Sequence, residues 1–145
     1  YDPMLAPDAI HAAGAEPVSL ETLLETSAVV SLNLPLTPET RNLIDAKALA
    51  RMAPDSILVN TARGGIVDEM ALAEALAQGR PGAAAGDVFA IEPPPPDHPL
   101  LKLANFIATP HLGSATQESL DRVGLSVVEQ VIDVLEGRRP PHVVS

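Results

Sequence analysis

Three ionisable side chains each follow an apolar segment of the chain: Arg63 after the first, Glu92 after the second and His111 after the third. The segments have the composition of short buried strands and comprise residues 57–60, 83–89 and 105–109. Because the carboxyl ends of parallel strands meet at one edge of a sheet, we expect the three side chains to converge on a single cleft.

This combination of groups suits the oxidation of a 2-hydroxy acid. The guanidinium of Arg63 can bind a substrate carboxylate through two hydrogen bonds. The imidazole of His111 can accept the hydroxyl proton as the hydride leaves. The carboxylate of Glu92 can hold the other imidazole nitrogen, which fixes the tautomer and the orientation of the ring. Taken singly, each residue is as well explained as a surface or loop side chain, and only their common order along the chain favours a site.

Alternating strand and helix signals predict an α/β fold whose mostly parallel sheet is built from βαβ units. Besides the three segments above, we expect a buried strand at 28–34, a brief one at 17–18 and the tail of one at 1–3. Helices are expected over 6–13, from 20, from 38, over 46–52, from 69 to a glycine stop at 79, and over 116–136. Ser19, Asp45 and Asp68 are the predicted N-caps.

The composition agrees with such a fold and excludes several functions. Of the 145 residues, 46% are hydrophobic and only 2% aromatic, so the core is aliphatic, as in parallel sheets that are buried on both faces. The formal net charge of −10 argues against a nucleic-acid surface and against an anionic membrane. There is no cysteine, and no two histidines have metal-ligand spacing, so we expect no metal. His98 is interpreted as a turn residue.

The motif Gly-x-Gly-x-x-Gly, which opens a dinucleotide-binding half, does not occur in the chain. The chain also begins at Tyr1 without an initiator methionine, and we therefore expect a fragment. Asp2 then stands where the ribose-binding acid at the end of a second strand would lie. On its own, Asp2 is more simply a turn residue before Pro3.

Four stretches of the sequence resemble the NAD-binding half of the D-isomer-specific 2-hydroxyacid dehydrogenase family. They comprise residues 31–40, 58–68, 86–93 and 109–113, in the order in which the family has them. Asn33, Pro81 and Gly86 depart from the family's usual residues, but none of these departures removes a catalytic group.

The resemblance implies a partial Rossmann-like, doubly wound parallel sheet followed by a long C-terminal helix. Residues 1–112 would form a partial NAD-binding domain that lacks its first strand and glycine loop. Residues 113–145 would form the helical segment that returns to the substrate domain. The cofactor would be NAD, because the carboxylate of Asp2 would bind the ribose hydroxyls and repel a 2′-phosphate.

The resemblance also implies a role for each matched residue. Arg63 would bind the substrate, His111 would be the general acid/base, and Glu92 would be its partner. The carboxylate of Asp87 would face the nicotinamide carboxamide. The cofactor-binding residues would be Asp2, Leu34, Pro35, Thr61, Ala62, Arg63, Asp87, His111 and Gly113.

The implied function is an NAD-dependent oxidoreductase that interconverts a D-2-hydroxy acid and its 2-keto acid. It would act in the cytoplasm as a homodimer or larger homo-oligomer, with neither nucleic acid nor membrane as a partner. A second interpretation is an NAD-sensing binding module without catalysis, because the C-terminal-binding-protein corepressors resemble the chain in fold and triad. A third is an inactive fragment that binds NAD weakly, because the pyrophosphate has no helix N-terminus to sit on.

Overall fold

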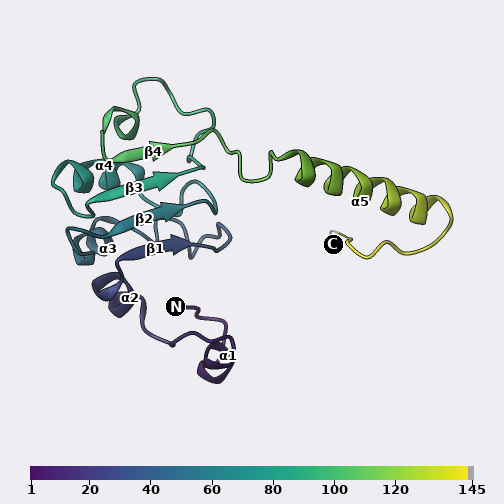
Figure 1. Ribbon diagram of the computed structural model, residues 1–145, viewed down its shortest axis with the longest axis horizontal. Helices are drawn as coiled ribbons and strands as arrows, with labels where there is room; N and C mark the ends of the chain where they lie inside the picture. The colour runs from purple at the N-terminus through teal and green to yellow at the C-terminus, as the bar shows by residue number, and fades with distance from the viewer. Residues whose placement is uncertain (144–145) are drawn as a thin grey trace. The chain divides into compact units, whose positions relative to one another are not determined.

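The computed structural model describes residues 1–143. Its sheet has four parallel strands in the order β1–β2–β3–β4, which is also their order in the chain (Figure 1). The strands are β1 (Val29–Leu32), β2 (Ile57–Asn60), β3 (Ala83–Gly86) and β4 (Phe106–Ala108). The predicted α/β fold is confirmed, and the carboxyl ends of all four strands lie at one edge of the sheet.

The predicted helix starts follow from side-chain caps. Ser19, Asp45 and Asp68 each accept backbone N–H groups of the helix that they precede, as predicted. The helices are α1 (Pro7–Ala12), α2 (Leu20–Thr26), α3 (Ala46–Arg51), α4 (Glu69–Ala77) and α5 (Gln117–Leu135). A 3₁₀ helix, η1 (Pro99–Lys102), lies in a segment for which the sequence predicts no helix.

Three predicted elements are wrong. Residues 1–3 form no strand, because the Asp2 carboxylate accepts the backbone N–H of Met4 at 2.8 Å and turns the chain. Residues 17–18 are not in a strand either. The helix expected from 38 is a turn, in which the Thr40 hydroxyl donates to the Pro35 carbonyl at 2.8 Å. The strand β2 has the predicted bounds, whereas β1, β3 and β4 are shorter than their apolar segments.

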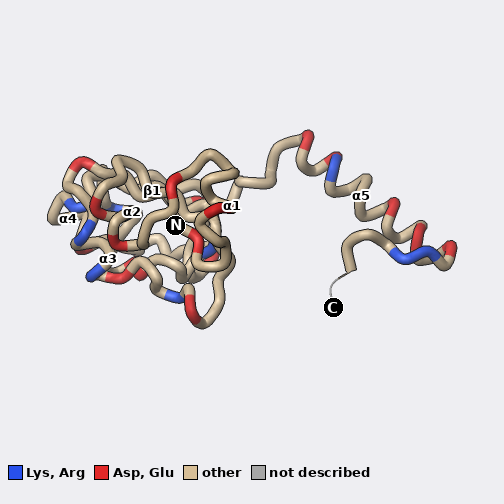
Figure 2. Tube along the Cα trace, turned by 90° about the horizontal axis from the view of Figure 1, so that it is seen from below, with Lys and Arg blue, Asp and Glu red and all other residues tan. Residues whose placement is uncertain are grey.

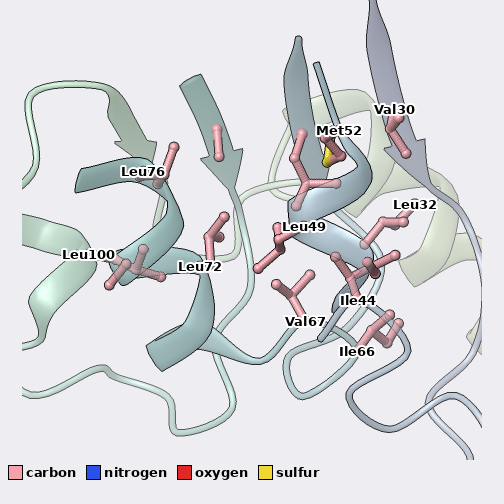
Figure 3. Close-up of a cluster of buried hydrophobic side chains, with 14 of the residues drawn as sticks. Val30, Leu32, Ile44, Leu49, Met52, Ile66, Val67, Leu72, Leu76 and Leu100 are labelled. Carbon is pink, nitrogen blue, oxygen red and sulfur yellow. The ribbon is translucent and has the colours of Figure 1, made fainter. Parts of the chain in front are cut away.

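The core lies on one face of the sheet, where α3 and α4 pack. Along β1 and β2 burial alternates, so that Val30, Leu32 and Leu58 point into this core. Figure 3 shows Leu49 of α3, Met52 directly after α3, and Leu72 and Leu76 of α4 directed into the same cluster.

The opposite face of the sheet is much less covered. Val29 is 56% exposed and Ile57 is 39% exposed. The expectation that the strands are buried on both faces is therefore wrong for the described residues, because the helices that pack closely on the sheet cover only one side of it.

The described chain consists of two compact units. The first is Tyr1–Pro110 and contains the sheet, and the second begins at His111 and contains α5. The apolar stripe predicted for this helix is present, but no residue of α5 is buried within the described chain. Acidic residues outnumber basic ones, 19 to 9, and charges of both signs lie along α5 (Figure 2). None of the helices described is long and apolar enough to cross a membrane.

Candidate active site

The turn that carries Arg63 is shaped by the last residue of β2. Asn60 is buried, and its side-chain oxygen accepts the backbone N–H of Ala62 at 3.1 Å. Its amide nitrogen donates to the carbonyl of Arg63 at 3.0 Å. The guanidinium of Arg63 is exposed beyond the sheet edge and donates to the Ala62 carbonyl at 2.7 Å. The buried side chain of Asn60 thus fixes the turn, and the guanidinium of Arg63 remains exposed to solvent.

The carboxyl ends of the three strands β2, β3 and β4 are tied together at Asp87. The backbone N–H of Asp87 donates to the carbonyl of Asn60 at 3.0 Å. Its buried carboxylate accepts the hydroxyl of Thr109 at 2.5 Å. Asp87 therefore lies at the expected edge of the sheet, one residue beyond the end of β3.

The loop that carries Glu92 lies against the turn that carries Arg63. The two backbones meet at Gly64, where an added Cβ would be only 1.9 Å from the carbonyl oxygen of Phe89. The Glu92 carboxylate accepts the backbone N–H of Phe89 at 3.0 Å, which folds its loop back on itself. The structure thus brings together the segments that carry two of the three predicted catalytic residues.

His111 lies three residues beyond the end of β4 and is the first residue of the second unit. Its backbone φ is 54°, in the left-handed region that few residues other than glycine adopt. Such a conformation is held only where the surroundings determine it, and it is frequent at functional sites. The placement of His111 and Gly113 relative to Arg63 and Glu92 stays a prediction.

The remaining predicted cofactor residues lie in the first unit. Leu34 is partly buried against the core after β1, and the carbonyl of Pro35 holds Thr40. Thr61 is exposed beyond β2, while Ala62 is partly buried. The role predicted for Asp2 is not tested by its contact with Met4.

Sequence reasoning missed three polar residues around this edge. Asn60 has no predicted role, although a buried asparagine at the end of an apolar run is a signal for turn formation. Thr109 is predicted only as the end of a strand. His98 is predicted as a turn residue, but its ring also accepts the Leu100 N–H as the cap of η1 and contacts Glu69. The Thr109–Asp87 and His98–Glu69 contacts join residues that are 22 and 29 positions apart, so they leave no local pattern in the sequence.

This parallel sheet, with its polar groups gathered beyond the strand ends, is a Rossmann-like domain of the NAD-binding type. Residues 1–113 match the family model described as "D-isomer specific 2-hydroxyacid dehydrogenase, NAD binding domain". The chain belongs to that family.

Relatives of the chain differ in the substrate that their names give. The D-3-phosphoglycerate dehydrogenase of Mycobacterium tuberculosis (strain ATCC 25618 / H37Rv) is 48% identical over all 145 residues. The glyoxylate reductase of Korarchaeum cryptofilum (strain OPF8) is 46% identical over the same length. The chain spans 27% of the first relative and 44% of the second.

Solved structures agree with the fold. The crystal structure of the TT0316 protein from Thermus thermophilus has a TM-score of 0.86 and 47% identity, and the match covers 90% of this chain and 42% of that one. The D-lactate dehydrogenase of Lactobacillus jensenii, solved with NAD⁺, has a TM-score of 0.88 at 31% identity. That match covers all of this chain and 47% of the other.

Proposed function

We propose that the full-length protein, meaning this chain with the sequence that adjoins it in the native polypeptide, interconverts a D-2-hydroxy acid and its 2-keto acid. NAD would carry the hydride. The observation that carries the proposal is the close approach of Gly64 to Phe89, because it joins the Arg63 turn to the Glu92 loop at the carboxyl edge of the sheet. Ligands bind at this edge in open α/β sheets.

The residues at this edge fit the nicotinamide end of the cofactor. Asp87 offers a buried carboxylate, and its backbone N–H donates to the carbonyl of Asn60, the residue before Thr61. A carboxylate is a suitable acceptor for the N–H donors of a carboxamide. When bound, NAD accepts or supplies the hydride. The described residues contain no glycine-rich loop of the kind that holds a pyrophosphate at a helix N-terminus.

Each catalytic role uses a group of this chain. The guanidinium of Arg63 forms two hydrogen bonds with the substrate carboxylate and orients the reacting carbon. Nε2 or Nδ1 of His111 accepts the hydroxyl proton during oxidation and returns it during reduction. Glu92 accepts the N–H on the other side of that ring, which keeps the imidazole in one tautomer.

Two substitutions in the full-length protein test these roles. His111→Ala is expected to lower kcat by about two to four orders of magnitude, because proton transfer loses its acceptor. Arg63→Ala is expected to raise KM and lower kcat together, because the side chain both positions and polarises the substrate. Normal turnover of His111→Ala, or an effect of Arg63→Ala confined to cofactor affinity, would refute the respective role.

The substrate is best sought among small 2-hydroxy acids. The 48% identity to a D-3-phosphoglycerate dehydrogenase makes D-3-phosphoglycerate the first candidate, followed by the substrates that the other relatives' names imply, glyoxylate and D-lactate. Steady-state rates of NAD reduction and NADH oxidation over this panel, with NADP as the alternative carrier, test the class. We further propose a cytoplasmic homodimer or larger homo-oligomer, to be measured by light scattering on the full-length protein.

A further inference from the structure

The Glu92 loop is held from outside by a carboxylate that the proposed reaction does not use. Glu69, the first residue of α4, accepts the backbone N–H of Ala90 through Oε1 at 2.6 Å. Its second oxygen, Oε2, lies 3.1 Å from Nε2 of His98. One carboxylate therefore joins the start of α4 to the Glu92 loop and to His98, the residue that caps η1.

This pair is largely withdrawn from solvent. The side chains of His98 and Glu69 are 11% and 17% exposed. Glu69 lines a small pocket together with the apolar residues Leu72, Val88 and Leu100. Hydrogen bonds in such apolar surroundings are stronger than in water, and an unmet donor or acceptor is more costly.

The second ring nitrogen of His98 fixes its tautomer. Nδ1 accepts the backbone N–H of Leu100 at 3.3 Å, so it carries no hydrogen. The ring hydrogen is then on Nε2 and is donated to Glu69. The ring also packs edge-on against Phe89, with the centroids 5.5 Å apart. His98 is thereby directed at Glu69 by both its hydrogen bonds and its packing.

Phe89 links this pair to the candidate active site. Its backbone N–H donates to the Glu92 carboxylate, and its carbonyl lies against Gly64 of the Arg63 turn. Ala90, the next residue, is the one that Glu69 holds. Glu69 therefore holds the peptide group directly after the one that donates to Glu92.

We propose that Glu69 and His98 are positioning residues, which hold the loop from Asp87 to Pro93 so that the Glu92 carboxylate is presented to the reaction. The inference rests on the proposed function for its catalytic consequence. Neither residue touches the substrate. Glu69 acts through the Ala90 N–H, and His98 acts by donating Nε2–H to Glu69.

Two substitutions of His98 separate this role from simple capping. His98→Gln can place a side-chain N–H where Nε2–H was, and so keeps the bond to Glu69 while losing the cap of η1. His98→Asn can place an oxygen where Nδ1 was, and so keeps the cap while losing Glu69. Both variants lose the ring contact with Phe89, so that they are matched in this respect.

The experiment is made on the full-length protein with NADH and the best 2-keto acid of the panel. His98→Asn and Glu69→Gln are expected to lower kcat by roughly 10- to 100-fold, with KM less affected, because misplacing a catalytic group by about 1 Å has effects of that order. His98→Gln should stay close to the wild type. Glu74→Gln, an exposed acid on the same helix, is the control for lost charge and should leave the rate unchanged.

A readout independent of turnover is hydrogen exchange at the amide of Ala90. Exchange should be faster in His98→Asn and Glu69→Gln than in the wild type and in His98→Gln. If His98→Gln is impaired as much as His98→Asn, the ring contact with Phe89 that both variants lose explains the effect, and the positioning role of the Nε2–H bond is refuted. If His98→Gln alone is impaired, the cap of η1 explains the effect, and the positioning role is refuted as well. If the wild type transfers no hydride to any 2-keto acid, the proposed function fails, and the exchange of Ala90 alone decides whether Glu69 and His98 hold the loop.

Discussion

Gly64 lies so close to Phe89 that no other residue fits between the two backbones: an added Cβ would be 1.9 Å from the Phe89 carbonyl oxygen and 2.1 Å from its carbon. The atoms that this Cβ would meet are backbone atoms of Phe89 and Ala90, which cannot rotate aside as a side chain can. This contact is what joins the Arg63 turn to the Glu92 loop, and a side chain at position 64 must separate them.

Gly64→Ala is therefore expected to destabilise the protein by about 3 kcal/mol, at the upper end for overpacking. Gly86→Ala is the matched control, because its Cβ would meet only the end of the Phe106 ring, at 3.1 Å. The gain of about 0.5–1 kcal/mol from replacing a strand glycine offsets most of that smaller clash. Chemical denaturation measures both variants, and equal losses would show that the 64–89 contact yields easily.

The bond between Thr109 and Asp87 gives a second prediction. Thr109→Val keeps the shape of the side chain but removes the hydroxyl that donates to the buried Asp87 carboxylate at 2.5 Å. The buried acceptor then has one donor fewer, which costs about 1–3 kcal/mol. Thr109→Ser retains the hydroxyl and should lose much less. Thermal unfolding of the two variants checks the prediction, which fails if valine and serine are equivalent.

Much of the fold could be predicted because it is encoded locally. Apolar segments marked the four strands, and Ser19, Asp45 and Asp68 marked helix starts through their cap chemistry. Because the strands were predicted to be parallel, their carboxyl ends were expected to lie at one edge of the sheet, as they do. The one-sided burial of the strands could not be inferred, because continuous apolar segments do not reveal which face the described helices cover.

The candidate site was predictable only in part, and the reason is sequence distance. Glu92 and Arg63 were predicted to share an edge from their places after strands, and the contact of Gly64 with Phe89 brings their segments together. The pair Glu69–His98 spans 29 residues and has no local signal. The departure from the family at Gly86 has a physical explanation, since the ring of Phe106 lies 3.1 Å from an added Cβ and leaves little room for a side chain larger than alanine.

Asn60 provides a test of how the Arg63 turn is held. Asn60→Asp keeps the acceptor for the Ala62 N–H but replaces the donor to the Arg63 carbonyl with an oxygen. Asn60→Ala loses both bonds. We expect both to destabilise the protein by about 1–3 kcal/mol, since buried groups are left unpaired. In the full-length protein KM for the keto acid should also rise, and an unchanged KM would mean that the Arg63 turn keeps its shape without Asn60.

The last prediction concerns the choice between NAD and NADP, for which Asp2 is the proposed determinant. The residue is exposed, and its carboxylate accepts the Met4 N–H at 2.8 Å. A carboxylate beside the adenosine ribose repels a 2′-phosphate, so Asp2→Ala should lower the ratio of kcat/KM for NAD over NADP by about tenfold, equivalent to about 1.4 kcal/mol. Asp8→Ala removes another exposed acid of the same segment and should leave this ratio unchanged. Rates of the full-length protein with each carrier provide the measurement. Should both substitutions leave the ratio as it is, Asp2 serves only to turn the chain toward α1, and the preference for NAD must be set by other residues.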